Sequence, residues 1–316
     1  DARKLHEQYP IDLNHCDNDM AMVFENTRAL TSLKEGNAQQ AQRIGASVTA
    51  RAEQAYGRGS VSANLCAATM CDAYYELDQL DDALQVLANR SGILRSSMPD
   101  VMGRASICRA RITLQRESPQ AALSFLETQS AHFHVLGLDR LLAFMLAEQV
   151  RVLVLQGENR RASELVTRLV ALQAAQRPHA EPREEISCQT ALSKARLALG
   201  MRDPLSALEP LQAVITYAEQ SARGRSVVRA RLLGAQAHAM LDQPEQARAH
   251  LQQAVQAGAR LGLVRTLLDE GPALLALLAQ WQDEIAGEDS VGEYLKALLC
   301  HETTQAQLSP VVSAPR

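Results

Sequence analysis

Aromatic residues are scarce in this chain, and it carries no excess of positive charge. Phe, Trp and Tyr make up 3% of the 316 residues, with a single Trp. A large β-sheet is typically richer in aromatic and β-branched residues, so we expect little sheet. The formal net charge is −4. A free-standing nucleic-acid-binding domain usually shows a basic excess, so we do not expect this segment to bind nucleic acid directly.

Several functional motifs are missing as well. No apolar run approaches the roughly 20 residues of a membrane-spanning helix, and the longest candidate, ALLALLAQW at 273–281, is far shorter. The chain has no GxxxxGK[ST] phosphate-binding loop, so we expect no ATP or other cofactor in this segment. Ser, His, Cys and carboxylate residues form no catalytic set by spacing. The sequence therefore does not predict an enzyme.

The cysteines and histidines point to no metal site. The six cysteines form no CxxC pair, and no histidine pair stands beside them at metal-binding spacing. We expect reduced, mostly packed thiols and a cytoplasmic location. His132 and His134 lie in HFHVLGLDR at 132–140. We interpret this stretch as a loop between repeats without a ligand role, or alternatively as the lip of a groove with Phe133 as a lid.

What the chain does contain is an internal repeat. Six segments share a turn residue, polar residues and an alanine that opens an apolar helical stretch. They are GNAQQA, DQLDDA, ESPQAA, GENRRA, RDPLSA and DQPEQA, ending at Ala41, Ala83, Ala122, Ala162, Ala207 and Ala247. Successive anchor alanines are separated by roughly 40 residues, and self-similarity at such a period predicts a solenoid of stacked helix pairs.

Each unit is predicted to consist of helix A, a tight turn and helix B. The anchor alanine should face inward, because a larger side chain would hold the two helices apart. Small or modest side chains also stand twelve residues before the anchors, at Ala29, Cys71, Ala110, Val150, Ala195 and Ala235. Residues that suit turn geometry stand between the helices, at Gly36, Asp78, Gly157 and Asp242.

This pattern resembles the tetratricopeptide repeat (TPR), although its period exceeds the usual value of about 34 residues. The resemblance implies an all-α fold, a right-handed superhelical solenoid of TPR-like helix-turn-helix repeats with a period of about 40 residues. We assign 1–18 to a linker or the end of a preceding helix and 301–316 to a C-terminal linker or tail. We assign 19–300 to the superhelical domain, with roughly seven helix pairs of which the last is atypical.

Charged residues recur on helix A at positions that should face the hollow of the superhelix. Eleven residues before the anchors stand Leu30, Asp72, Arg111, Arg151, Arg196 and Gln236. Eighteen residues before them stand Val23, Leu65, Arg104, Phe144, Gln189 and Arg229. Guanidinium groups suit carboxylates, phosphates or sugar hydroxyls. The candidate ligand-binding residues are therefore Asp72, Tyr75, Arg104, Arg111, Phe144, Arg151, Gln189, Arg196 and Arg229.

Each candidate also has a purely structural interpretation. The arginines could pair with carboxylates such as Asp72 and Glu148, or simply face solvent. Tyr75 and Phe144 could stack on a sugar or an aromatic effector, but each could equally pack in the core. Trp281 is expected to cap the last hydrophobic layer.

The segment GLVRTLLDEGPALLALL at 262–278 departs from the repeat. It resembles the segment that closes the helical-repeat region of the large ATP-binding LuxR-type regulators, the MalT-like family. Arg265, Asp269, Glu270 and Gly271 carry most of this resemblance, which covers roughly 19–300. In that family the region lies between an N-terminal NTPase core and a C-terminal helix-turn-helix. The resemblance implies a sensor segment that binds an effector and signals to the ATPase.

The leading hypothesis is therefore the effector-sensing domain of a bacterial transcriptional activator. A small molecule in the concave groove would shift the population of superhelical curvatures. Its expected partners are that effector and the ATPase and helix-turn-helix domains of the same polypeptide, with ATP bound only in an N-terminal domain outside this chain. The chain begins at Asp1 without Met, so we expect a piece of a longer polypeptide; a homo-oligomer is compatible with the sequence. The alternatives are a TPR-type peptide- or protein-binding scaffold and a structural spacer.

Overall fold

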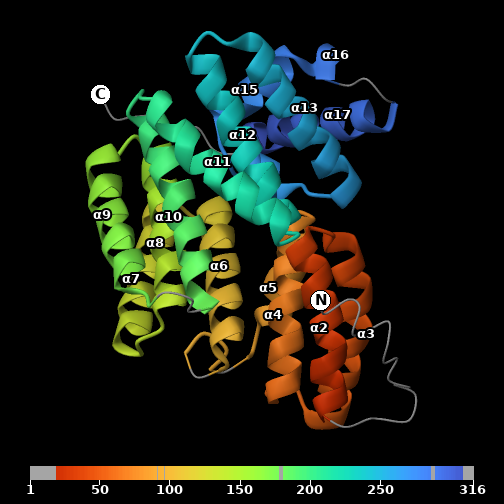
Figure 1. The fold of residues 1–316 in the computed structure, drawn as a ribbon. Helices are drawn as coiled ribbons and strands as arrows, with labels where there is room; N and C mark the ends of the chain where they lie inside the picture. Colours follow the sequence, from red (N-terminus) through yellow and green to blue (C-terminus); the bar gives the residue numbers. More distant parts are fainter. Residues whose placement is uncertain (1–18, 91, 96, 178–180, 286–288, 309–316) are drawn as a thin grey trace, which may run out of the picture.

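Helices stacked side by side make up the protein (Figure 1). The computed structural model describes residues 19–90, 92–95, 97–177, 181–285 and 289–308, and these contain no strand. The segment 1–18, predicted to be a linker or the end of a preceding helix, and the last eight residues, 309–316, lie outside the described residues. The predicted all-α, TPR-like repeat fold is confirmed.

Six helix pairs follow one another along the chain. The A helices are α2 (Asp19–Glu35), α4 (Val61–Glu76), α6 (Pro99–Arg116), α8 (Asp139–Leu155), α10 (Glu181–Gly200) and α12 (Gly224–Met240). The B helices are α3 (Ala38–Tyr56), α5 (Leu80–Leu87), α7 (Pro119–Val135), α9 (Asn159–Ala175), α11 (Leu205–Gln220) and α13 (Pro244–Leu261). The C-terminal helices are α14 (Arg265–Leu268), α15 (Pro272–Gln280), α16 (Gln282–Ile285) and α17 (Asp289–Leu308).

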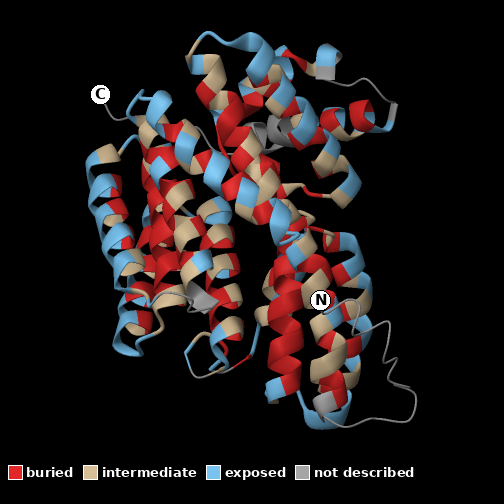
Figure 2. Cartoon of the chain, viewed as in Figure 1, coloured by how far each residue is buried: buried red, intermediate tan, exposed pale blue. Residues whose placement is uncertain are grey.

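The predicted register of the repeat is confirmed by burial. All six anchor alanines lie on B helices and have 0% exposure. The six small residues that precede them by twelve positions are buried on the A helices. Figure 2 shows the same division, with buried residues on the facing sides of the helices and exposed residues on the outer sides. The small side chains allow the two helices of each pair to approach closely.

Helix A ends in the same way in most units. The residue five positions before the anchor has a positive φ in five of the six units, at Gly36, Asp78, Gly157, Arg202 and Asp242. This conformation lets the next backbone N–H reach back to a carbonyl of the last helical turn. Gln79, for example, donates to the carbonyl oxygen of Tyr74 over 2.9 Å. The turn residues predicted from the sequence therefore complete the C-terminal capping turns of the A helices.

Three local predictions differ from the structure. His132 and His134 lie in the last turn of α7, not in a loop, because the first helix-breaking residue after them is Gly137. Phe133 is fully buried and therefore is not a lid. Helix α17 continues to Leu308, eight residues beyond the predicted end of the repeat domain, and 301–308 contains no Gly or Pro.

Two predictions about packing hold. Cys66, Cys71, Cys108 and Cys188 are buried and form no disulfide bond, whereas Cys300 is exposed. Cys16 lies outside the described residues. Trp281 is 9% exposed and packs in the C-terminal hydrophobic cluster with residues of α13, α15 and α17.

The superhelix also brings distant parts of the chain together. Gly36, directly after α2, lies against Gly224 at the start of α12, and a Cβ on Gly224 would lie 2.3 Å from the carbonyl oxygen of Glu35. Beyond α13 the chain turns inward, and the backbone N–H of Val264 donates to the carbonyl oxygen of Glu76 over 3.2 Å. The Glu76 carboxylate in turn accepts a hydrogen bond from the backbone N–H of Thr266. The first two units therefore pack against segments from the far end of the repeat array.

Candidate functional site

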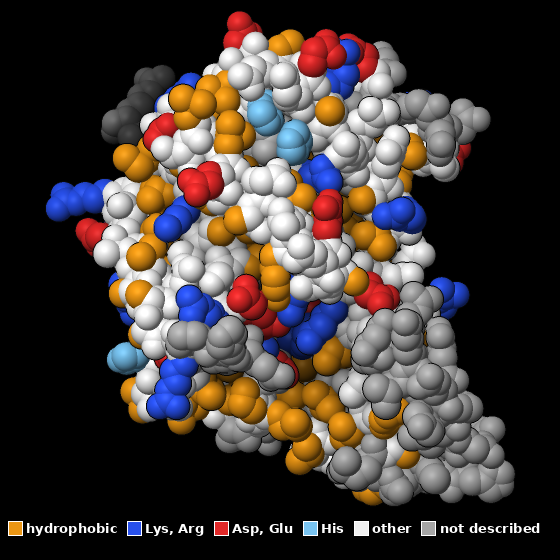
Figure 3. All heavy atoms as spheres, in the orientation of Figure 1, with side chains coloured by type: hydrophobic (Ala, Val, Ile, Leu, Met, Phe, Trp, Pro, Cys, Tyr) orange, Lys and Arg blue, Asp and Glu red, His pale blue; other side chains and the backbone are white. Residues whose placement is uncertain are grey.

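A cavity of about 190 Å³ lies where the A helices converge. Its lining residues all belong to the six A helices, apart from Arg223, the N-cap residue of α12. Figure 3 shows basic and acidic side chains gathered in a hollow near the middle of the visible face. The A helices thus line the concave surface, as the repeat pattern predicts.

The cavity brings together six of the nine candidate residues. These are Asp72, Arg104, Arg111, Phe144, Gln189 and Arg229. Arg151 and Arg196 lie deeper and line a second, more apolar cavity of about 490 Å³ between α8, α10, α12 and α15. Tyr75 is 1% exposed, and its ring lies under the guanidinium groups of Arg111 and Arg265 at 5.7 and 5.6 Å. Its ring is packed in the interior and lines neither cavity.

Four carboxylates around the cavity are each shared by two arginines. Glu148 accepts hydrogen bonds from both Nε and Nη2 of Arg111, over 3.1 and 2.9 Å, and is also bound by Arg151. The other three sets are Asp72 with Arg104 and Arg225, Glu185 with Arg140 and Arg223, and Glu270 with Arg196 and Arg229. The ion pairs that the structural interpretation predicts for Asp72 and Glu148 are therefore present. Asp72, Glu148 and Glu185 line the cavity themselves.

Burial and these ion pairs act in opposite directions on the carboxyl groups. Burial alone would raise the pKa of Glu148, but Arg111 and Arg151 outweigh it and hold the pKa well below its usual range. Burial likewise opposes Arg225 and Arg104 at Asp72, whose pKa is also lowered. Both carboxylates are therefore ionised in the folded protein at neutral pH.

The arginines in turn crowd one another. Burial and the neighbouring Arg111 lower the pKa of Arg229 to about 10, although Glu270 opposes this. Burial and Arg104 lower the pKa of Lys34, which stands at the rim of the same cavity. Arg229 and Lys34 are therefore less well compensated than Arg111 and Arg225, whose pKa values nearby carboxylates raise.

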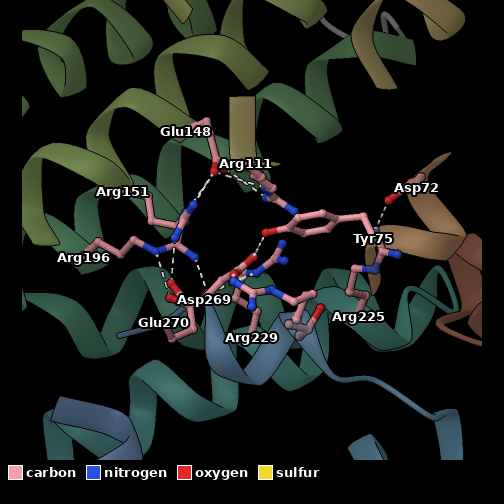
Figure 4. A network of polar contacts seen from close by, with 12 residues as sticks. Asp72, Tyr75, Arg111, Glu148, Arg151, Arg196, Arg225, Arg229, Asp269 and Glu270 are labelled. Carbon is pink, nitrogen blue, oxygen red and sulfur yellow. Dashed lines mark hydrogen bonds and ion pairs between the residues drawn. The ribbon is translucent and has the colours of Figure 1, made fainter. Parts of the chain in front are cut away.

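The segment 265–271 is part of the connection between α13 and α15. Its residues Asp269 and Glu270 lie among the arginines of the A helices (Figure 4). Arg265 binds Asp78 of the second unit and Asp269 of its own segment, over 3.2 and 2.5 Å. Asp269 also accepts a hydrogen bond from the hydroxyl of Tyr75 over 2.8 Å. Glu270 is held by both nitrogens of the Arg196 fork, over 2.6 and 3.1 Å.

Each residue that carries the family resemblance in this segment has a structural role. Arg265, Asp269 and Glu270 are buried and paired. Gly271 has a φ of +96°, and a Cβ there would lie 2.4 Å from Cδ2 of Leu155. The segment is therefore an internal closure that covers the deep arginines with carboxylate groups and with the backbone carbonyl of Asp269, which accepts from Arg151 over 2.7 Å.

Several cavity residues were not among the sequence candidates. Lys34, Asp100, Arg140, Glu185, Arg223 and Arg225 all line it. Four of them share one register, twenty-two residues before the anchors, namely Asp100, Arg140, Glu185 and Arg225. This register lies one helical turn before the eighteen-residue register, on the same helix face. Extending the repeat alignment by one turn would have found them, and Arg140 does bridge its register neighbours Asp100 and Glu185.

Comparison with known proteins assigns the fold to a family. A family model described as the MalT-like TPR region matches residues 31–284. The chain belongs to this family. No curated protein matched it. Membership in the MalT-like TPR region indicates a regulatory domain of MalT-type regulators, and TPR-type repeats are generally non-catalytic.

Two general properties of this MalT-like TPR region follow from its described residues. None of the described helices combines the length and apolar character that a membrane span requires. Within the same residues, His, Cys, Asp and Glu side chains form no group of three or more that could hold a metal ion.

Proposed function

We propose that this MalT-like TPR region is the effector-sensing domain of a cytoplasmic bacterial LuxR-type transcriptional activator, and that a small molecule binds in the 190 Å³ cavity. The observation that carries the proposal is the position of the cavity, whose wall includes side chains from all six A helices. The cavity wall is therefore shared by all six units of the array. Small displacements at each interface of a solenoid add along its length.

The signal would leave the cavity in two directions. Arg229 of the cavity wall binds Glu270, and Glu270 belongs to the segment that leads into α15 and the other C-terminal helices. Lys34 and Leu33 lie at the end of α2, in the first unit. A ligand with different affinities for two arrangements of these elements shifts their populations. The neighbouring ATPase and helix-turn-helix domains would receive the signal, with ATP bound in the former.

The peptide-scaffold alternative is less well supported. A peptide bound along the concave surface would need the inner faces of the A helices. Residues 265–271 of the chain itself already occupy part of that surface, where they pair with Arg151, Arg196 and Tyr75. A small molecule needs only the cavity that remains open.

A thermal-shift screen with a matched pair of variants tests the proposal. Gln189→Trp places a large side chain in the cavity, whereas Gln252→Trp makes the same change on an exposed position of α13. A ligand at a hundred times its dissociation constant stabilises the fold by about 2.7 kcal/mol. We expect metabolites that raise the melting temperature of the wild type and of Gln252→Trp by a few degrees, but not that of Gln189→Trp. Equal stabilisation of Gln189→Trp by every hit would rule out the cavity as the effector site.

A further inference from the structure

The cavity wall carries more positive than negative charge. Seven cationic side chains line it, namely Lys34, Arg104, Arg111, Arg140, Arg223, Arg225 and Arg229, against four carboxylates, Asp72, Asp100, Glu148 and Glu185. The lining carboxylates cannot remove this excess, because Asp72, Glu148 and Glu185 are each already shared by two arginines. An excess of positive charge in a partly enclosed cavity favours an anion.

Arg229 is the least compensated of these groups. Its partner Glu270 gives both oxygens to Arg196, with hydrogen bonds of 2.6 and 3.1 Å, and meets Arg229 only through Nε at 3.1 Å. Arg225, one turn earlier on α12, forms ion pairs with both Asp72 and Glu76, over 3.0 and 3.2 Å, but its Nη2 is buried without a hydrogen-bond partner. The α12 side of the cavity therefore presents the weakly paired charge of Arg229 and an unused N–H group of Arg225.

Other lining groups offer hydrogen bonds and an apolar surface. The side chains of Lys34, Gln189 and Ser226 line the cavity, and none of them makes a hydrogen bond or ion pair with another described residue. The apolar side chains of Ile107, Leu141 and Phe144 also line the cavity. A ligand that suits both surfaces has a charged head and a compact apolar body.

The volume limits the size of that body. An engineered apolar cavity of about 150 Å³ holds benzene. The 190 Å³ found here therefore suits a ligand with on the order of ten non-hydrogen atoms. A molecule as large as an oligosaccharide exceeds this volume and would have to extend out of the cavity.

We propose that the effector is a small organic anion, a carboxylate or phosphate ester on a compact apolar body, and that its anionic group competes with Glu270 for Arg229. This inference rests on the proposed function and names the chemistry of its ligand. Glu270 lies at the end of the segment 265–271, so an anion that draws Arg229 away weakens one of the two ion pairs that fix this carboxylate. Arg196 keeps its own contact with Glu270, so the fold persists while the C-terminal segment gains freedom.

Matched acid and amide pairs test the charge requirement by isothermal titration calorimetry on the full chain. The probes are benzoate with benzamide, cyclohexanecarboxylate with its carboxamide, and phenyl phosphate with phenol, alongside glucose and maltose. We expect at least one acid to bind and its neutral partner to bind at least ten-fold more weakly. If an amide or a sugar binds in the cavity as tightly as the acids, the proposal that the effector is an anion is wrong, while the proposed sensing function is still supported. If acids, neutral partners and sugars all fail to bind at millimolar concentration, both proposals fail.

Variants test the position of the anion. Arg229→Gln should weaken acid binding at least ten-fold and should still fold, because Glu270 keeps its two bonds to Arg196. Lys34→Gln, at an exposed position, should weaken binding several-fold without affecting the fold. Arg161→Gln removes an arginine from the exposed Glu158 pair outside the cavity and should change nothing. Unchanged affinity in Arg229→Gln contradicts the proposed position.

A variant of Glu270 tests whether the anionic group of the ligand competes with this carboxylate for Arg229. Glu270→Gln removes the internal rival for Arg229, so acids should bind several-fold more tightly, provided that circular dichroism shows the wild-type helix content. If this variant does not fold, the double variant Arg196→Gln/Glu270→Gln removes the buried pair together and gives the same comparison. Weaker or unchanged acid binding in a folded variant that lacks Glu270 contradicts competition.

Discussion

At the scale of single residues, the charge balance of the interior depends on carboxylates that each form ion pairs with two arginines. Glu148 is 5% exposed; Arg111 reaches it from the neighbouring A helix, and Arg151 reaches it from its own helix. Burying any one of these charges alone would be costly, because an isolated ion loses its hydration without compensation. Such a carboxylate therefore compensates the buried charge of both arginines around it.

Glu148→Gln should lower the free energy of unfolding by about 3–5 kcal/mol, the usual cost of removing one partner from a buried ion pair. The amide keeps the shape but leaves two guanidinium groups without an anion. Urea unfolding followed by helical circular dichroism measures the change. Glu158→Gln makes the same substitution at a half-exposed Glu158–Arg161 pair and should stay within about 0.5 kcal/mol of the wild type. Equal effects of the two substitutions would mean that the interior pairs contribute no more than surface pairs.

Prediction from the sequence succeeds for residues that recur at the same position in each repeat unit. The anchor alanines, the turn residues and the arginines at two fixed registers follow from spacing alone, since every unit places them at the same point on helix A or B. The depth of each position does not follow from spacing. Arg104 and Arg229 reach the open cavity, whereas Arg151 and Arg196 lie beneath the segment 265–271. That segment belongs to no repeat, so its position was not readable from the alignment.

At the scale of elements, the meeting of α2 and α12 depends on a glycine. A Cβ on Gly224 would lie 2.3 Å from the carbonyl oxygen of Glu35 and 2.9 Å from Cδ1 of Leu261. The first atom is backbone and cannot rotate away, so one of the two helices must move. The helix propensity of alanine would favour the substitution by only about 1 kcal/mol.

Gly224→Ala should therefore destabilise the protein, by about 1–3 kcal/mol, as is usual for overpacking in a close contact. We expect faster amide hydrogen exchange at the end of α2 and the start of α12 than elsewhere. Gly59→Ala is the control, because no atom lies within 4 Å of its built Cβ. Uniform exchange across all helices in Gly224→Ala would show that this contact does not join the two ends.

At the scale of the whole molecule, contacts between distant units depart from the simplest behaviour of a solenoid. In a simple array each unit touches only its neighbours. Here Glu76 of the second unit accepts hydrogen bonds from the backbone and side chain of Thr266, and Asp78 binds Arg265. The repeat alignment predicts the stack but not this closure, because nearest-neighbour packing carries no information about what fills the hollow. The closure makes the buried carboxylates of several units part of one cooperative structure.

Acid should therefore destabilise the molecule as a whole. The pKa values of Asp72, Glu148, Glu185 and Asp269 are all lowered, since nearby arginines outweigh the effect of burial. In the unfolded chain these groups titrate near their ordinary values of about 4. Below about pH 5 the unfolded chain therefore binds more protons than the folded one. The free energy of unfolding therefore decreases as the pH is lowered. Their stabilisation is complete above their unfolded pKa values and is lost as the pH drops toward the folded ones.

A histidine adds an earlier stage with the same sign. Burial and then His238 lower the pKa of His250 to about 4, against about 6.5 when unfolded, so its contribution to stability decreases between these two values. Urea midpoints measured from pH 8 to pH 3 should therefore decline gently below pH 6.5 and steeply below pH 5. His250→Gln should remove the gentle stage alone, and Glu148→Gln should make the steep stage shallower, because Asp72, Glu185 and Asp269 still contribute to it. A midpoint that stays constant down to pH 3 would contradict ionised, paired carboxylates in the interior.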